Sequence, residues 1–269
     1  MSEKIMTECH YSEVESRSSH FHNAYEMLFI RRGSGVIEVG GQEHHVGADT
    51  LMFFSNLEEH VTRIQTRPFH RYFVKLDPDR LNRGLSTPWQ LSIFKNRPQG
   101  FIPYVNVGEY AQEIDGLFRL LLRESRQGGE YSDELVLSVV RQILILTYRC
   151  EPSRFALCDQ EEQRSCAQMQ HWIETHFTEN VQIKDITENF FISSSHFCRT
   201  FKRATGYTPK QYLMLNRVAH AKELLVHSDL RISEISRRSG FMDESNFTRY
   251  FKRETGNTPS EYRKLMEGR

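Results

Sequence analysis

The last hundred residues of the chain contain an internal duplication. Residues 195–212 read SHFCRTFKRATGYTPKQY, residues 245–262 read SNFTRYFKRETGNTPSEY, and eleven of these eighteen positions are identical. Upstream, residues 181–187 (VQIKDIT) match residues 230–236 (LRISEIS) at an offset of forty-nine, so the second copy has one more residue between its two halves. A sequence repeat at a fixed spacing indicates a repeated structural unit. The chain must therefore end in a fold that builds the same small unit twice.

Each copy predicts a helix, a turn and a second helix. In the first copy, apolar residues at 183, 186 and 190 share one helix face, and Phe197 and Phe201 form the apolar face of the next helix. Ser193 or Ser194 can cap that second helix, and Gly206 can end it. The helix-turn-helix units are expected at about residues 183–206 and 232–256.

A longer helix is expected between the two copies. Thr208-Pro209 and Thr258-Pro259 each place a capping hydroxyl before a proline suited to the first helical position. The helix predicted over residues 209–227 has a length of about 28 Å. With its turns it can hold two reading helices roughly 34 Å apart, which is the spacing of successive major-groove turns on one face of DNA.

The rest of the chain predicts three further segments. Residues 25–30, 35–39 and 51–54 are rich in β-branched and aromatic residues and are separated by glycines, which favours antiparallel strands in a barrel or jelly roll over residues 1–105. Residues 106–150 predict a helical hairpin, broken at Gly128-Gly129, that we expect to form a dimer contact. The polar residues 151–164 predict a linker before an all-α domain at residues 165–269.

The second helix of each unit is the predicted DNA-reading element. In a helix-turn-helix the first helix braces the phosphate backbone, and side chains near the start of the second reach base edges. Arg199 and Arg249 suit base reading because a guanidinium group can bind guanine O6 and N7 together, whereas Lys202 and Lys252 suit phosphates. The candidate DNA-binding residues are Ser194, Ser195, His196, Arg199, Lys202, Glu244, Ser245, Asn246, Thr248, Arg249 and Lys252.

The net charge of zero does not argue against DNA. From Ser165 onward the chain has 16 Lys and Arg against 12 Asp and Glu, or +4, and the preceding residues hold 19 against 23, or −4. The net charge of zero is the sum of a positive part and a negative part of the chain. A modest positive charge on the second part predicts binding that weakens with salt.

Residues 166–269 resemble the tandem helix-turn-helix domain of AraC/XylS-type transcriptional regulators. The motif that carries the resemblance is IxxIxxxxGFxDxSNFxRxFKRxxGxTPSEYR, which runs from Ile232 to Arg263. The resemblance implies a cytoplasmic bacterial regulator, expected to be an activator, that binds promoter DNA as a homodimer. It also implies RNA polymerase as a partner and Arg199 and Arg249 as the base-reading arginines. Phe197 departs from the leucine that is frequent in the family, a change that concerns packing only.

A second group of residues points to a ligand site in the first hundred residues. His20, His22 and Glu26, followed by Gly33, form HxHx3Ex6G, and their even spacing would direct them to one side of a strand. With His60 they resemble the motifs of cupins, the small barrels whose enzymes bind a divalent metal through three His and one Glu. The second motif is degenerate, because Asn56 and Leu57 stand where a cupin has a Pro/Gly turn.

We expect this site to take a small organic effector and no cofactor. Its expected lining is His20, His22, Tyr25, Glu26 and His60. A metal is not favoured, but if one is bound, the ligands are His20, His22, Glu26 and His60.

Two alternatives remain open at this point. The first is a metal-dependent cupin enzyme fused to a DNA-binding domain, although no nucleophile–base motif argues for catalysis, so a non-enzyme is expected. The second is a thiol-switch regulator that uses Cys9, Cys150, Cys158 or Cys166. The sequence shows no secretory signal, and its most apolar run, residues 143–148, is too short to cross a membrane.

Overall fold

The structure is a computed structural model of the chain, and it describes residues 4–13, 20–85, 87–95, 100–155, 160–190 and 192–267. The chain divides into two compact units, residues 1–158 and 159–269. Each unit is described by itself. In the described ranges, no helix is both long enough and apolar enough to span a bilayer.

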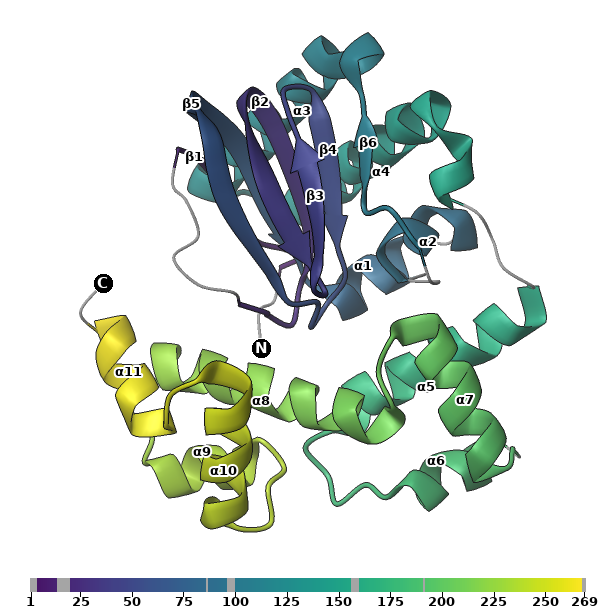
Figure 1. Cartoon of the computed structure of the whole chain (residues 1–269), viewed down its shortest axis with the longest axis vertical. Helices are drawn as coiled ribbons and strands as arrows, with labels where there is room; N and C mark the ends of the chain where they lie inside the picture. The colour runs from purple at the N-terminus through teal and green to yellow at the C-terminus, as the bar shows by residue number, and fades with distance from the viewer. Residues whose placement is uncertain are drawn as a thin grey trace. The chain divides into compact units, whose positions relative to one another are not determined.

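The first unit is built on an antiparallel sheet (Figure 1). Its strands pair in the order β1-β5-β2-β4-β6, with β3 paired to β2. This confirms the predicted antiparallel β domain, and among the described residues β1, β3 and β6 each pair with one strand. The strands are β1 (Met6–Ser12), β2 (Tyr25–Val39), β3 (Gln42–Val46), β4 (Thr50–Phe54), β5 (His60–Leu76) and β6 (Tyr104–Asn106).

Gly33 lies in a bulge within one long strand, and does not separate two strands as the sequence predicts. The predicted strands at residues 25–30 and 35–39 are the two halves of β2, and β5 pairs with both. The register against β5 shifts around Gly33, whose φ is +85°, and a Cβ there would lie 2.7 Å from the carbonyl oxygen of Pro68. Only glycine fits this close approach, so the strand bends and continues.

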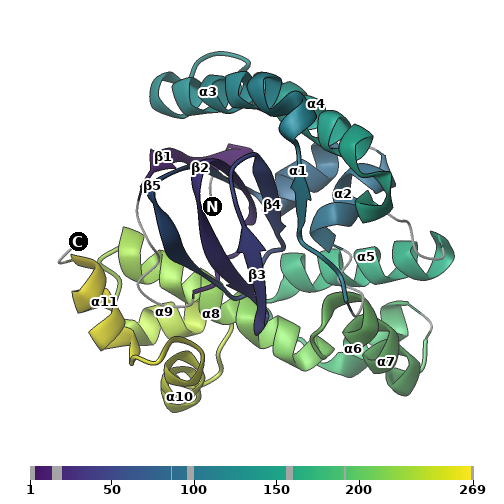
Figure 2. The same cartoon turned by 45° about the horizontal axis from the view of Figure 1, so that its top comes forward.

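Helices cover one face of this sheet, and Figure 2 shows α3 and α4 lying across it. Phe29 of the sheet stacks on Phe118 of α3, which also stacks on Tyr72. The opposite face encloses a smaller apolar core that includes Leu28 and Phe54. The predicted helical hairpin is observed, with α3 ending at Gly128. The helices are α1 (Pro78–Gly84), α2 (Pro88–Lys95), α3 (Ala111–Gln127) and α4 (Ser132–Cys150), with 3-10 turns at Gly108–Tyr110 and Pro152–Phe155.

The linker predicted at residues 151–164 is shorter in the structure. Pro152–Phe155 forms a 3-10 turn, and Phe155 is buried with its ring 5.6 Å from that of Trp89 and 5.5 Å from that of Tyr148. The next helix already begins at Gln160. Phe155 packs its aromatic ring in the first unit. Residues 151–155, the first part of the predicted linker, therefore belong to that unit.

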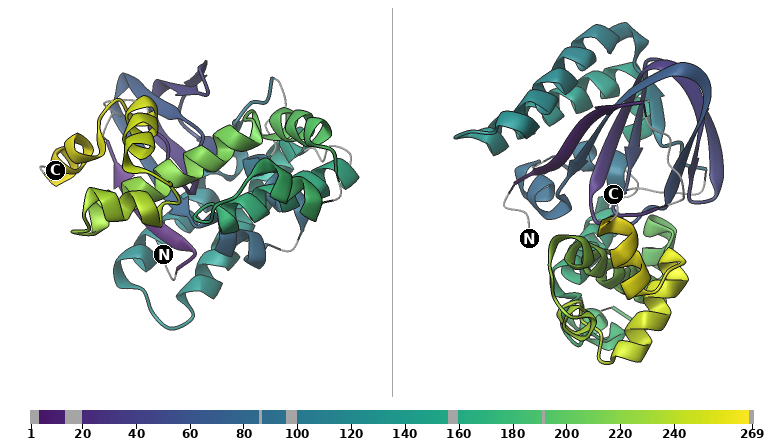
Figure 3. Two further views of the ribbon diagram at one scale, coloured as in Figure 1. Left: turned by 90° about the horizontal axis from the view of Figure 1, so that it is seen from below. Right: turned by 90° about the vertical axis from the view of Figure 1, so that its left-hand side faces the viewer.

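The second unit is all α-helical and contains the two predicted helix-turn-helix pairs. Figure 3 shows the long helix α8 running between the two groups of shorter helices. Ser193 caps α7 by accepting from the His196 N–H, and Thr208 caps α8, as the sequence predicts. The helices are α5 (Gln160–His176), α6 (Ile183–Asn189), α7 (Ser194–Thr205), α8 (Pro209–His227), α9 (Ile232–Arg238), α10 (Glu244–Thr255) and α11 (Pro259–Glu267).

The same three aromatic rings anchor the reading helix in both copies. In the first copy, the ring centroids of Phe197 and Phe201 are 5.5 Å apart, and those of Phe201 and Tyr212 are 5.3 Å apart. The corresponding distances in the second copy, among Phe247, Phe251 and Tyr262, are 5.6 and 5.4 Å. All are edge-to-face contacts, a favourable geometry for aromatic pairs. These aromatic residues, which are identical in the two copies, therefore set the orientation of α7 and α10 from the core.

A second contact joins the two copies to each other. The buried Arg217 of α8 donates from Nε to the carbonyl oxygen of Phe177, at 2.7 Å, and from Nη2 to that of Glu179, at 2.8 Å. Gly240, in the turn of the second copy, has φ +82°, and a Cβ there would lie 2.5 Å from the Phe177 oxygen and 2.9 Å from Arg217 Nε. We call this contact, together with the adjacent Phe241, the Arg217–Gly240 joint.

We expect Gly240→Ala to destabilise the second unit by about 3 kcal/mol or more, because strain at positive φ adds to the steric overlap. Gly206→Ala is the matched control: its φ is +79°, but no atom lies within 4 Å of an added Cβ, so it should cost only about 1 kcal/mol. Urea unfolding followed by Trp172 fluorescence in a Trp89→Phe background measures both. Equal losses for the two variants would contradict the close packing at Gly240.

Candidate functional site

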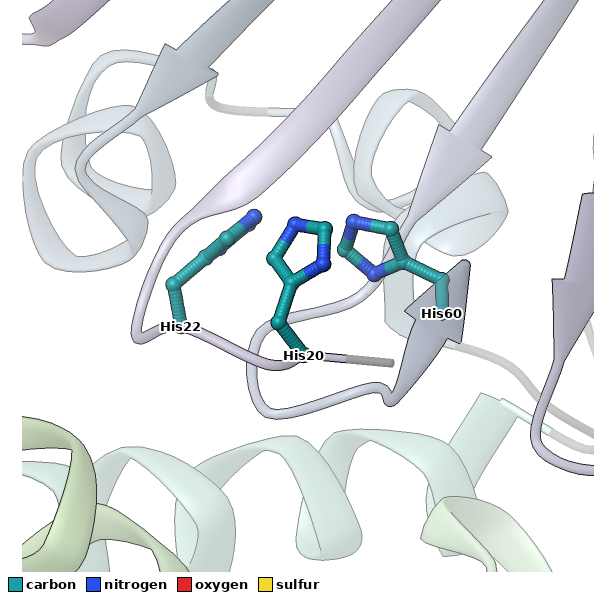
Figure 4. A group of neighbouring side chains, drawn as sticks. All are labelled: His20, His22 and His60. Carbon is teal, nitrogen blue, oxygen red and sulfur yellow. The ribbon is translucent and has the colours of Figure 1, made fainter. Parts of the chain in front are cut away.

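Three histidines of the first unit converge in space (Figure 4). His20 and His60 exchange two backbone hydrogen bonds, of 3.1 and 3.0 Å, and their ring centroids are 4.5 Å apart. The His22 ring lies 5.3 Å from that of His60. One ring nitrogen from each histidine lies within 4.8 Å of the others. With Glu26 at the start of β2, we call these residues the histidine cluster.

Glu26 supplies a buried negative charge to the histidine cluster. Its Oε2 lies 2.8 Å from His22 Nε2 and 3.8 Å from His60 Nε2. Burial opposes ionisation of this carboxyl, but the hydrogen bond with His22 and the nearby positive groups outweigh that effect and lower its pKa to about 2. Glu26 is therefore a carboxylate at neutral pH.

Two histidines of the cluster, His22 and His60, are neutral rings at neutral pH. Burial lowers the pKa of His60 to about 4, against the opposite pull of Glu26, and burial also lowers the pKa of His22. His60 Nδ1 lies 2.9 Å from the carbonyl oxygen of Glu58, so a proton on Nδ1 is donated there and Nε2 keeps its lone pair. This arrangement, in which one ring nitrogen is anchored and the other is available, is typical of metal-binding histidines.

The donor set fits two kinds of ligand. Neutral imidazoles with a carboxylate are suited to divalent transition metals such as zinc, iron or manganese. The same groups, next to the apolar Leu28 and Phe54, also suit a polar organic molecule, since binding sites combine apolar lining with a few placed polar groups.

Tyr25 does not line the histidine cluster, so this part of the predicted lining is wrong. Consecutive residues of a strand point to opposite faces, so the side chain of Tyr25 lies on the other side of the sheet from Glu26. Its ring stacks on Phe94 at 4.9 Å within the core under the helices, and the residue is 1% exposed. Of the expected lining residues, His20, His22, Glu26 and His60 come together and Tyr25 does not.

Arg71 is a polar residue of the same face that sequence reasoning missed. It stands opposite Ile30 in the β2–β5 register, just as Lys75 stands opposite Glu26, so these side chains share the Glu26 face. Arg71 is 9% exposed and donates from Nη1 to Thr62 Oγ1 at 3.0 Å. Burial lowers its pKa, and the charge of Glu26 partly restores it. No motif marks this arginine in the sequence, because its position depends on the pairing of distant strands.

The candidate DNA-binding residues lie on the outer face of the two reading helices. Phe197 and Phe247 point into the core, and Arg199 and Arg249 are exposed. In the second copy, Arg249 Nη2 donates to Asn246 Oδ1 at 3.0 Å. The other exposed candidates are Ser194, Ser195, His196, Lys202, Glu244, Ser245 and Lys252, while Asn246 and Thr248 are half-buried.

The cysteines give little support to a thiol switch. Burial raises the pKa of Cys9 to about 12 and also raises that of Cys150, which disfavours the reactive thiolate in both. Cys166 is buried, and Cys158 lies outside the described residues.

Comparison with known proteins places both units in one family. The family model of the AraC-like ligand binding domain matches residues 7–140, and that of a helix-turn-helix domain matches residues 186–265. The chain belongs to the AraC/XylS-type family of transcriptional regulators. As in that family, a ligand-binding β domain precedes a helical DNA-binding domain.

Three known proteins illustrate the similarity. The lactose operon transcription activator of Staphylococcus xylosus is 24% identical over 79% of this chain and 74% of its own length. The transcriptional activator RhaS of Salmonella typhimurium is 25% identical over 82% and 78%. The crystal structure of ToxT from Vibrio cholerae with a bound unsaturated fatty acid has a TM-score of 0.66 at 14% identity and covers 100% of this chain and 99% of its own. This last likeness concerns the fold.

We expect the first unit to lose about 2 kcal/mol of stability between pH 7.5 and pH 5. The unfolded chain takes up a proton at His60 near its ordinary pKa of 6.5, whereas the folded chain does so only near 4, so acid favours the unfolded state across that interval. Urea midpoints followed by Trp89 in a Trp172→Phe background measure the loss. His60→Gln should remove most of it, and an undiminished pH dependence in that variant would assign the effect to other groups.

Proposed function

We propose that the chain is a promoter-binding activator whose first unit binds a small-molecule effector at the histidine cluster. The observation that supports this site is the convergence of His20, His22, His60 and Glu26 on one face of the ligand-binding domain, beside an apolar core. The proposal of an activator rests on the names of the relatives, two of which are transcription activators.

In this proposal, α7 and α10 enter the major groove of promoter DNA. Arg199 and Arg249 bind base edges, and Lys202 and Lys252 bind phosphates. The remaining candidates (Ser194, Ser195, His196, Glu244, Ser245, Asn246 and Thr248) line the same exposed faces and tune the base preference. Such a regulator works in the cytoplasm with RNA polymerase as its partner.

We also propose that the helical hairpin forms a homodimer. Two apolar side chains are exposed at the start of α4: Tyr131 (70%), the N-cap residue, and Leu135 (38%), in the first turn. Exposed apolar side chains on an otherwise packed helix are suited to a subunit contact. A dimer would place four reading helices on one operator, and effector binding in the first unit would shift the equilibrium between two such placements.

Arg199→Ala and Arg249→Ala are each expected to weaken binding to the preferred operator by about 10- to 100-fold and to relax the preference at one base pair, because each removes one guanine contact. Arg123→Ala, an exposed arginine on α3, is the matched control for loss of charge and should bind normally. Gel-shift titration against selected operator DNA measures the affinity, and light scattering of the complex gives the number of bound chains. Unchanged retention in the double variant would exclude these base contacts, and one chain per operator would exclude the dimer.

A metal-dependent sensor is the second candidate, favoured by the orientation of His60 Nε2 toward Glu26 and the neighbouring rings. The ligands would be His20, His22, His60 and Glu26, and a bound metal would supply a Lewis-acidic anchor for an effector. An enzyme built on the same ligands is less favoured, because the relatives are transcriptional regulators. A cofactor is not part of the proposal.

Thermal-shift screening separates these candidates. If the effector is organic, some compounds of a metabolite library should raise the unfolding temperature of the chain by several degrees, and His22→Ala should reduce that rise. If a metal is bound, elemental analysis should find about one zinc, iron or manganese per chain, and this metal should be lost in His60→Ala. If the screen finds no ligand response and the analysis finds no metal, the histidine cluster has only a structural role in the sheet.

A further inference from the structure

The two reading helices differ at the position three residues before the arginine. The first copy has His196 before Arg199, and the second has Asn246 before Arg249. Asn246 is held at both ends: its backbone N–H donates to Asp243 Oδ1, the helix cap, at 2.6 Å, and its side-chain Oδ1 accepts from Arg249 Nη2 at 3.0 Å. The guanidinium group of Arg249 also lies 5.8 Å from the centre of the Tyr250 ring.

The first copy lacks the hydrogen bond between Asn246 and Arg249, which we call the tether. In the part of the chain that the structure describes, no side chain pairs with Arg199, and the residue is exposed. Its neighbour His196 uses its backbone N–H for the Ser193 cap at 3.4 Å, as Asn246 does for Asp243, but its ring makes no contact with Arg199. The two arginines therefore occupy equivalent positions, but their side chains differ in conformational freedom.

The tether changes what the second helix can read. An asparagine that pairs with adenine needs its Oδ1 to accept from N6 and its amide to donate to N7. Here Oδ1 already accepts one hydrogen bond from Arg249, and only its second lone pair remains for adenine N6. The N–H groups of Arg249 that do not bind Asn246 are all donors, and guanine, with O6 and N7, offers only acceptors in the major groove.

We propose that Asn246 is a positioning residue for Arg249, and that it makes the second copy the stricter reader of guanine. This inference rests on the proposed base reading by Arg199 and Arg249. A side chain that is already ordered loses less freedom on binding, so the tether should raise the preference for guanine by about 3- to 10-fold over that of a free arginine.

The test uses the full chain and an operator selected by the wild type from random DNA. Affinities are then measured for all single base-pair changes, and the base pair that Arg249→Ala no longer discriminates is assigned to Arg249. Asn246→Leu, which keeps the size but removes the acceptor, should lower the guanine preference at that base pair by about 3- to 10-fold. The base pair assigned to Arg199, which lies in the other copy, should be read as before.

Two further variants distinguish positioning from a structural role. Asn246→Asp keeps Oδ1, so it should retain the guanine preference while its added charge lowers the affinity for all sequences, more so at low salt. In the Arg249→Ala background, Asn246→Leu should have no further effect on discrimination. An equal loss of affinity for every operator in Asn246→Leu, or additive losses in the double variant, would overturn the proposal. If Arg249→Ala itself leaves every base preference unchanged, the proposed base reading fails instead.

Discussion

The second unit depends on one buried arginine. Arg217 lies in the middle of α8 and donates to two backbone carbonyls that follow α5, where those groups have no partner within a helix. A buried guanidinium group is tolerated only when its donors are used, and here the acceptors belong to the start of the first copy while the turn of the second copy packs on the same group. Because the Arg217–Gly240 joint fixes both copies on α8, this helix is not a flexible linker between them.

The second copy repeats this solution at its other end. Arg263 of α11 donates to carbonyls beyond the C-terminus of α8, at 2.8 Å for Leu230 and 3.4 Å for Ser228. Each copy is therefore closed by an arginine that satisfies the free carbonyls of the preceding helix end. The aromatic rings orient the reading helices within each copy, and the arginines fix the copies with respect to the helices before them.

Local patterns were enough to predict the second unit, and long-range pairing limited the prediction of the first. Helix spacing and capping residues act within a few positions, so α7, α8 and the role of Gly206 follow from the sequence. The bulge at Gly33 and the position of Arg71 depend on where β5 pairs with β2, which no local pattern specifies. The sequence motif predicts the histidine cluster. It does not predict the face of the sheet on which the Tyr25 side chain lies, because the segment before β2 is not a regular strand.

Each copy combines an identical aromatic core with an outer face that is only partly identical, and this has a consequence for how such a regulator can diverge. The ring contacts of the two copies agree within about 0.1 Å although positions of the outer face have changed, from His196 to Asn246 and from Cys198 to Thr248. Substitutions on the outer face thus leave folding almost untouched. Each half of the operator can accordingly drift in sequence and be followed by its own reading helix, without a matching change in the other half.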